Sequence, residues 1–175
     1  MSHQVLIVMG SDSDYPVLTP CLDLLDTFDI QYQVRICSAH RSPQMAADLA
    51  VQAESAGFSV IIAAAGLAAH LPGVLAAWTT LPVIGVPIES GPLAGQDALY
   101  AVVQMPPGVP VATVGINGSV NAAILAAQII GVHHDDIRRQ LHQYKATLRQ
   151  SVSDRQKKID QILNDRQVKT KQSLS

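Results

Sequence analysis

Short apolar runs recur along the chain at regular intervals. Val5–Met9 is the first of them: it has the length of a strand, is polar on neither face and ends at Gly10. A run of this kind is typical of a strand that is buried on both faces of a parallel sheet. Similar segments follow at residues 33–37, 59–64, 83–86 and 109–114. The pattern therefore predicts five strands.

Helical patterns fill the gaps between these runs. The clearest begins at Ser42, a good N-cap residue, followed by Pro43 at the first helical position. Its expected apolar face consists of Ala46, Leu49, Ala50 and Ala53. Gly57 is expected to end this helix. Pro20 falls inside the first expected helix, so that helix either starts at Thr19–Pro20 or kinks there.

The alternation of strands and helices predicts an α/β fold, a three-layer α-β-α sandwich with helices on both faces of a parallel sheet. Five strands suggest the flavodoxin-like order 2-1-3-4-5, by analogy. A helical stripe then predicts a long amphipathic C-terminal helix, packed on its own or a neighbouring protomer; it comprises Ile137, Leu141, Tyr144, Leu148 and Val152. We expect a single domain over residues 1–165 and a frayed tail at residues 166–175.

The charges are divided unevenly along the chain. Residues 1–134 carry two Lys/Arg against nine Asp/Glu, a net charge of −7, whereas residues 135–175 carry ten against five, a net charge of +5. A nucleic-acid-binding body would need several cations, so that class is nearly excluded. Residues 98–134 carry no charge at all, a stretch too long to be entirely interior. We expect part of it to face another subunit.

Compartment and membrane signals point to a cytoplasmic protein. Cys21 and Cys37 form no CxxC pair, and no secretory signal opens the chain. Residues 55–78 carry no formal charge, but glycines, a proline and a histidine interrupt the stretch, so we expect no membrane span. These features favour a soluble protein in a reducing compartment.

Polar residues gather directly after the first three expected strands. The three segments are MGSDSD (9–14), SAHRSP (38–43) and AGLAAHLPG (65–73). In a doubly wound sheet, ligands bind outside the carboxyl ends of the strands. The sequence therefore predicts one site at which these three segments converge.

Arg41 is the strongest candidate for anion binding. It precedes the start of a helix, where free backbone N–H groups favour an anion, and the Ser11 and Ser38 hydroxyls complete a plausible cradle for one phosphate. The alternative is a surface arginine paired with Asp12 or Asp14. Asp14 is suited either to accept hydrogen bonds from sugar hydroxyls or to cap a helix.

Two histidines belong to the same segments. An imidazole gives and takes a proton near neutral pH, so His40 is a candidate acid/base, with a merely solvated loop histidine as the alternative. His70 is either a satisfied core histidine or a group that orients a substrate carboxylate or carboxamide. The acids and histidines have no diagnostic metal-ligand spacing, so no metal site is predicted.

The absence of particular motifs argues against several classes of enzyme. The chain contains no GxGxxG, no GxxxxGK[ST] and no GxSxG, and its first lysine is Lys145. These absences disfavour a dinucleotide-binding fold of the Rossmann type, a P-loop NTPase and an α/β-hydrolase.

The motifs together resemble one family. Besides the segments at 9–14 and 38–43, the matching stretches are AAHLPG (68–73), GVP (85–87), residues 93–113 and NAAILAAQI (121–129). The chain resembles the N5-carboxyaminoimidazole ribonucleotide mutases, the catalytic subunits of bacterial phosphoribosylaminoimidazole carboxylase (class I). This resemblance implies a flavodoxin-like fold, a homo-octamer and no metal or organic cofactor. It also leaves room for transient contact with the ATP-dependent carboxylase that supplies the substrate.

The resemblance also implies an activity and residue roles. The family moves a carboxylate from the exocyclic nitrogen to the adjacent ring carbon of an aminoimidazole ribonucleotide, in purine (IMP) biosynthesis. His40 would be the general acid/base, and the substrate-binding residues would be Ser11, Asp14, Ser38, Arg41, Gly66 and His70. The alternatives are a carboxylase of aminoimidazole ribonucleotide that uses free carbon dioxide, and a non-catalytic nucleotide-binding module.

Two positions depart from the family pattern. Leu67 stands where the family usually has glycine, and residues 115–122 form a shorter segment than usual. Both departures concern the shape of the pocket, and neither affects His40 or Arg41.

Overall fold

The structure is a computed structural model that describes residues 4–172. It consists of two compact units, the first ending at Arg138 and the second beginning at Arg139. The helices and strands, in chain order, are β1 (Gln4–Met9), η1 (Asp12–Asp14), α1 (Tyr15–Thr27), β2 (Gln31–Ile36), α2 (Pro43–Ala53), β3 (Phe58–Gly66), α3 (Leu71–Ala76), β4 (Val83–Ile88), α4 (Gln96–Val103), β5 (Ala112–Thr113), α5 (Ser119–Gly131) and α6 (Asp135–Gln172).

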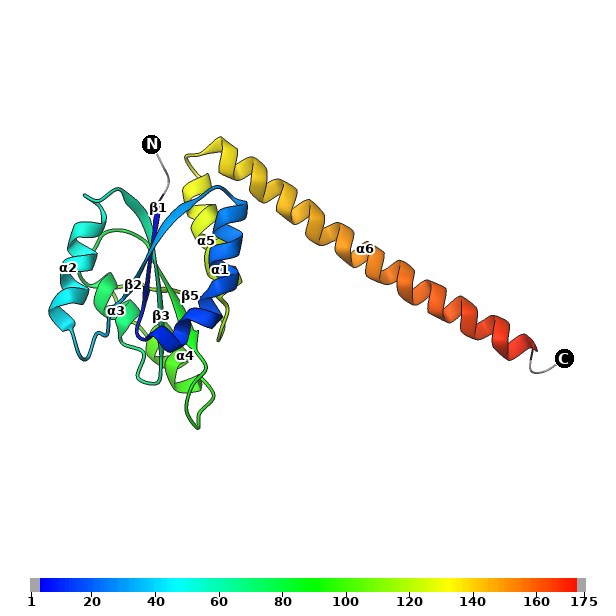
Figure 1. Cartoon of the computed structure of the whole chain (residues 1–175), viewed down its shortest axis with the longest axis horizontal. Coiled ribbons are helices and arrows are strands. Elements are labelled where there is room, and N and C mark those ends of the chain that lie inside the picture. The colour runs from blue at the N-terminus through cyan, green and yellow to red at the C-terminus, as the bar shows by residue number, and fades with distance from the viewer. Residues whose placement is uncertain (1–3, 173–175) are drawn as a thin grey trace. The chain divides into compact units, whose positions relative to one another are not determined.

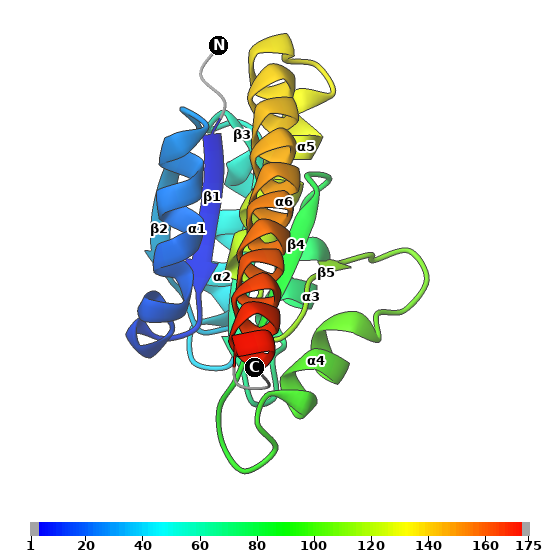
Figure 2. The same cartoon turned by 90° about the vertical axis from the view of Figure 1, so that its right-hand side faces the viewer.

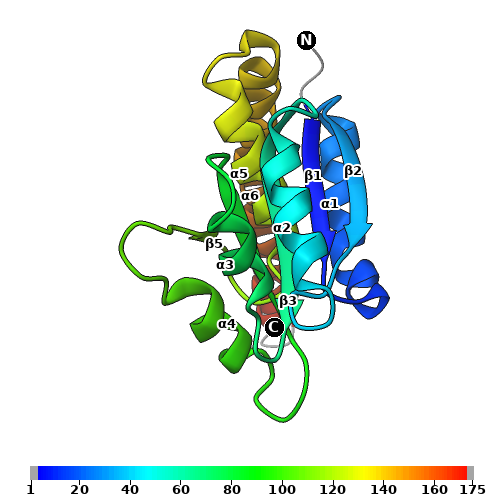
Figure 3. The same cartoon turned by 90° about the vertical axis from the view of Figure 1, so that its left-hand side faces the viewer.

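The first unit is built on one parallel five-stranded sheet in the order β2-β1-β3-β4-β5 (Figure 1). This confirms the predicted three-layer sandwich and its strand order. Helices α1 and α5 pack against each other on one face of the sheet (Figure 2). Helices α2 and α3 cover the other face (Figure 3).

Small side chains bring α2 close to the sheet. Ala46, Ala50 and Ala53, three of the four residues expected on the apolar face of this helix, are buried in one hydrophobic cluster. The cluster also holds Ile61 and Ala63 of β3, together with residues of α3. Successive strand side chains point to opposite faces, so every second residue of β3 serves this cluster. The predicted apolar face of α2 is thereby confirmed.

The two edge strands differ from expectation. All six residues of β2 are partly or fully exposed, because β2 pairs only with β1, so the expectation of burial on both faces is wrong there. The last strand was expected over residues 109–114, but β5 spans only Ala112–Thr113. Prolines precede it at positions 106, 107 and 110. Since proline lacks an N–H group, it shortens strand pairing.

Helix α2 begins at Pro43, directly after Ser42, as predicted. The Ser42 hydroxyl does not cap the helix; it donates a hydrogen bond to the Ser38 carbonyl at 2.9 Å. The helix ends at Ala53, before the position at which Gly57 was expected to end it. Gly57 instead has a φ of +89° in the turn that leads into β3, a conformation that glycine adopts freely.

Helix α1 begins at Tyr15 and continues through Pro20. The alternative start at Thr19 is therefore wrong. Pro16 lies in the first turn, where the backbone N–H groups have no intrahelical partner and a proline removes nothing. Pro20 lies inside the helix and does remove one backbone hydrogen bond.

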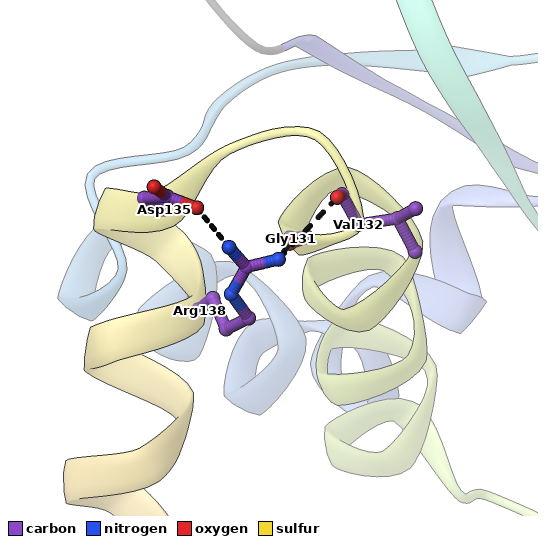
Figure 4. A network of polar contacts seen from close by, with 4 residues as sticks. All are labelled: Gly131, Val132, Asp135 and Arg138. Carbon is purple, nitrogen blue, oxygen red and sulfur yellow. Dashed lines mark hydrogen bonds and ion pairs between the residues drawn. The ribbon is translucent and has the colours of Figure 1, made fainter.

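Arg138 stabilises the C-terminal end of α5 (Figure 4). Its Nη1 atom donates to the carbonyl oxygens of Gly131 and Val132, each at 3.4 Å, and its Nη2 atom donates to the Asp135 carboxylate. The last carbonyl oxygens of a helix lack intrahelical donors, and the Arg138 guanidinium group supplies hydrogen bonds to two of them.

Helix α6 is unbroken from Asp135 to Gln172, which confirms the predicted long C-terminal helix. Residues 173–175 of the expected frayed tail lie outside the described residues. The single domain over residues 1–165 and the fraying from residue 166 onward stay predictions. None of the helices within residues 4–172 combines the length and the apolar character that crossing a membrane requires.

We predict that Gly85→Ala destabilises the fold. Gly85 lies in the middle of β4, and a Cβ atom there would approach Val102 Cγ1 to 2.3 Å and Val111 Cγ1 to 2.9 Å. Overpacking of this kind lowers the free energy of unfolding by about 1–3 kcal/mol, measurable by urea denaturation. Gly115→Ala is the matched control, since a Cβ there meets nothing within 4 Å. Equal stability of the two variants would contradict the packing argument.

Candidate active site

A cavity of about 570 Å³ opens at the carboxyl edge of the sheet. The structure brings all of the predicted site residues together in its lining, namely Ser11, Asp14, Ser38, His40, Arg41, Gly66 and His70. The other lining residues are Gly10, Ser13, Ala39, Ala65, Leu67, Ala68, Leu71 and Ser90. The loops that follow β1, β2 and β3 therefore converge, as the sequence predicts.

The loop after β1 holds Ser11 and Asp14 in a capping box. The Ser11 hydroxyl accepts the Ser13 N–H at 3.3 Å, and the Asp14 carboxylate accepts the Ser11 N–H at 3.2 Å. Asp14 is only 7% exposed, and this burial raises the pKa of its carboxyl group, although hydrogen bonds from Ser11, Ser13 and Gly10 oppose the shift. Asp14 thus combines the capping role with a place in the pocket wall.

The loop after β2 fixes the base of the Arg41 side chain. Ser38 Oγ accepts hydrogen bonds from the backbone N–H of Arg41 at 3.3 Å and from its Nε at 3.4 Å. In the described part of the chain no ion pair joins Arg41 to Asp12 or Asp14, so the alternative of a paired surface arginine is wrong. Arg41 is exposed and lines the pocket, and within residues 4–172 its guanidinium group forms no ion pair with a carboxylate.

The two predicted histidines contact each other. His40 Nε2 and His70 Nδ1 lie 2.7 Å apart, a hydrogen bond in which the tautomers decide the donor. Their ring centroids are 4.8 Å apart and the rings are steeply inclined, at 74°. Both side chains are exposed, which excludes a core role for His70. The two imidazole rings are therefore joined by one hydrogen bond at the pocket surface.

The end of β3 is shaped by a close contact. A Cβ atom on Gly66 would lie 2.5 Å from Ser90 Oγ and 3.3 Å from the Ile88 carbonyl oxygen, so a larger residue there would force the Ser90 hydroxyl to move. The next residue, Leu67, has a φ of +53°, a left-handed conformation that favours glycine. This agrees with the expectation of glycine at that position and indicates that leucine is held there under strain.

Ser90 is the residue that sequence reasoning missed. It lines the pocket, and its buried hydroxyl has no hydrogen-bond partner among residues 4–172. A signal was present, because Ser90 follows the carboxyl end of β4 just as the predicted residues follow the preceding strands. The sequence VIGVPI of β4 is apolar throughout, so no polar motif marks this strand end.

The short segment 115–122 does not line this pocket. Asn117 ties it to the end of β4: its side-chain oxygen accepts the Glu89 N–H at 2.9 Å, and its side-chain nitrogen donates to the Glu89 carboxylate at 3.1 Å. The shorter length of this segment therefore does not change the residues of the same chain that line the cavity.

The chemistry available in the pocket is anion binding and proton transfer. Arg41, with serine hydroxyls and helix-start N–H groups, suits a phosphate, and the His40–His70 pair suits proton transfer. Within the residues that the structure describes, no group of three or more His, Cys, Asp and Glu side chains has a metal-binding arrangement.

Known proteins match this sequence over nearly its whole length. An N5-carboxyaminoimidazole ribonucleotide mutase of Thermotoga maritima is 48% identical over 159 residues, which cover 91% of this chain and 93% of that protein. A protein of the same name from Pyrococcus horikoshii is 47% identical over 156 residues, covering 89% and 88%. These matches confirm the resemblance inferred from the motifs.

The fold and a family model agree with these matches. A crystal structure of a Treponema denticola PurE2 variant superposes with a TM-score of 0.83 at 29% identity, and the match covers 90% of this chain and 98% of that one. The protein-family model described as AIR carboxylase matches residues 4–151. The chain therefore belongs to the AIR carboxylase family.

Proposed function

We propose that this protein is an isomerase that converts N5-carboxyaminoimidazole ribonucleotide to 4-carboxy-5-aminoimidazole ribonucleotide, a step of purine biosynthesis. The observation that carries the proposal is the pairing of an acid/base and an anion-binding group on one turn. His40, in contact with His70 at 2.7 Å, is followed directly by Arg41 at the wall of the same cavity.

The substrate's phosphate binds at Arg41. Residues 1–134 contain only one other cation, Arg35, and Arg35 donates to Gln33 and to the Val34 carbonyl on β2. Arg41 therefore provides the positive charge at the pocket, and Ser11 and Ser38 add hydroxyl donors. Asp14 accepts hydrogen bonds from the ribose hydroxyls. A guanidinium group binds phosphate with charge-assisted hydrogen bonds, which are the stronger kind.

His40 then moves one proton twice. As an acid it gives a proton to the exocyclic nitrogen while the N–carboxylate bond breaks and carbon dioxide forms. The electron-rich ring carbon attacks the trapped carbon dioxide, and His40 as a base removes the proton from that carbon. The carboxylate has moved and the proton has returned, so atoms and charge balance and no other reactant enters. His70 orients the His40 ring and shares its proton.

The pocket wall retains the carbon dioxide. Ala65 and Ala68 have small side chains and Gly66 has none, so the backbone can approach the imidazole ring of the substrate closely. Exclusion of water from this spot prevents hydration of the intermediate. The reaction needs no metal or organic cofactor, because the aminoimidazole ring is itself the nucleophile.

The proposal extends to assembly and location. We place the protein in the cytoplasm as a homo-octamer, in transient contact with the ATP-dependent carboxylase that supplies its substrate. Exposed apolar side chains in the uncharged segment 98–134, among them Tyr100, Val103 and Val132, support a subunit contact. The two free cysteines are compatible with a reducing compartment.

The direct test of the proposal is substrate choice. We expect the purified protein to convert N5-carboxyaminoimidazole ribonucleotide that carries an isotopically labelled carboxylate, with the label retained in the product when unlabelled bicarbonate is present. Turnover only with aminoimidazole ribonucleotide and bicarbonate would establish the carboxylase alternative. Ligand binding without turnover of either substrate would establish a non-catalytic module.

We predict that His40→Asn abolishes turnover and leaves binding intact. General acid–base catalysis contributes about 10²–10⁴-fold, and here one residue acts in two steps, so kcat should fall by at least that factor. Steady-state kinetics and titration with the product nucleotide measure the two effects. His142→Asn, which removes an exposed imidazole from α6, is the matched control. Near-normal kcat in the His40 variant would remove this residue from its role.

Arg41→Ala is predicted to weaken substrate binding more than it slows the reaction. Loss of charge-assisted hydrogen bonds of about 1.5–3 kcal/mol raises KM by roughly 10–100-fold. Arg35→Ala removes the same charge from β2 and should leave KM unchanged. If both variants shift KM equally, the effect is one of net charge and the phosphate does not bind at Arg41.

A further inference from the structure

The Ser90 hydroxyl is an unpaired polar group at the wall of the active-site cavity. Ser90 lines the cavity, its Oγ atom is buried, and within residues 4–172 that atom has no hydrogen-bond partner. Burial of a hydroxyl group without a partner costs free energy, so such groups are rare in folded proteins. At the wall of a ligand-binding cavity, a group that is unpaired in the free protein is suited to pair with the ligand.

Ser90 lies on the opposite side of the cavity from Arg41. The sheet has the order β2-β1-β3-β4-β5, and Arg41 follows β2 whereas Ser90 follows β4. Neighbouring strands lie about 4.8 Å apart, so three such spacings separate the ends of β2 and β4 by roughly 14 Å. Ile88, the last residue of β4, is paired with Gly66 at the end of β3. A nucleotide with its phosphate at Arg41 would thus direct its base toward Gly66 and Ser90.

The side of the cavity formed by the ends of β3 and β4 has few other hydrogen-bonding side chains. Of the described lining residues on this side, only His70 and Ser90 carry polar side chains. The others are Ala65, Gly66, Leu67, Ala68 and Leu71. His70 Nδ1 is already in contact with His40. An ionised carboxylate only accepts hydrogen bonds, and the Ser90 hydroxyl is a donor that is free to serve one here.

We propose that the Ser90 hydroxyl donates a hydrogen bond to the carboxylate that the enzyme moves. This inference rests on the proposed function, since it concerns the same substrate. In the free protein the hydroxyl faces Gly66, where an added Cβ atom would lie 2.5 Å from Oγ. Rotation about the Cα–Cβ bond turns the hydroxyl toward the cavity and breaks no hydrogen bond within residues 4–172. The exocyclic nitrogen and the adjacent ring carbon are close neighbours, so one hydroxyl serves the carboxylate on either atom.

The hydrogen bond stabilises the carboxylates of substrate and product more than the carbon dioxide that forms between them. A carboxylate is charged, and hydrogen bonds to charged groups are roughly twice as strong as those between neutral groups. Carbon dioxide has no net charge, so much of the interaction is lost as the N–carboxylate bond breaks. Loss of the Ser90 hydroxyl should therefore raise KM without lowering kcat.

The test compares two nucleotides that differ only in the carboxylate, 4-carboxy-5-aminoimidazole ribonucleotide and aminoimidazole ribonucleotide. For Ser90→Ala we expect calorimetric titration to show that the Kd of the carboxylated nucleotide rises about 10–100-fold and that of the other is unchanged. KM for N5-carboxyaminoimidazole ribonucleotide should rise by a similar factor, with kcat close to that of the wild type. The matched control is Ser11→Ala: both nucleotides carry the phosphate, so both should bind more weakly by the same factor.

Ser90→Ala should leave the free energy of unfolding unchanged in urea denaturation, because the hydroxyl has no partner to lose. A marked loss of stability would reveal a structural role and overturn the inference, as would equal changes in the two Kd values or no change in either. The proposed function would survive these results, provided that the wild type binds and converts its substrate. If the wild-type protein binds neither nucleotide, the proposed function is wrong and the inference is wrong with it.

Discussion

The parallel register of β1, β2 and β3 is the constraint on which the active site depends. Met9 at the end of β1 is paired with Ile36 of β2 and with Ala64 of β3, so the three strands end nearly level. A slip by one residue would turn the buried side chains of β1 and β3 to the opposite face of the sheet, so the hydrophobic core fixes the register. Loops that are distant in the sequence are thereby held at one edge.

Within that edge, short polar contacts limit the freedom of the reactive groups. Ser38 holds the base of the Arg41 side chain, and His70 holds His40 from a loop thirty positions further along the chain. Each contact lies in a loop that follows the carboxyl end of a strand of the sheet. Arg41 and His40, the groups proposed to bind phosphate and to transfer the proton, are consequently held by the protein before any substrate arrives, which is the arrangement that catalysis by orientation requires.

The sequence was sufficient for the parts of the fold that depend on local pattern. Buried strands such as Val5–Met9 are apolar at every position, and Ser42 and Pro43 mark the start of α2. The length of β5 was not predictable from apolar content, because the nearby prolines decide how many backbone donors remain for pairing. The partial exposure of β2 follows from its place at the edge, which only the assembled sheet reveals.

The same division holds for the site. Its members were predictable because each follows the end of a strand, and strand ends meet at one edge of a parallel sheet. The contact between His40 and His70 was not predictable, since it depends on the path of two loops. Ser90 was missed because its role arises from a glycine on another strand: the absence of a side chain at Gly66 is what admits its hydroxyl.

The strained positions at this edge show how the chain accommodates its departure from the family. Leu67 and Ala94 have positive φ angles in loops that follow the carboxyl ends of β3 and β4, a conformation that costs such residues about 1–2 kcal/mol. The tip of Leu67 lies close to Gly91, where a Cβ atom would approach its Cδ2 to 2.9 Å. A glycine in the neighbouring loop thus makes the space that the leucine occupies. Because the added bulk packs against Gly91, the substitution is compatible with an intact His40–Arg41 turn, which argues against a chain that has lost its catalytic site.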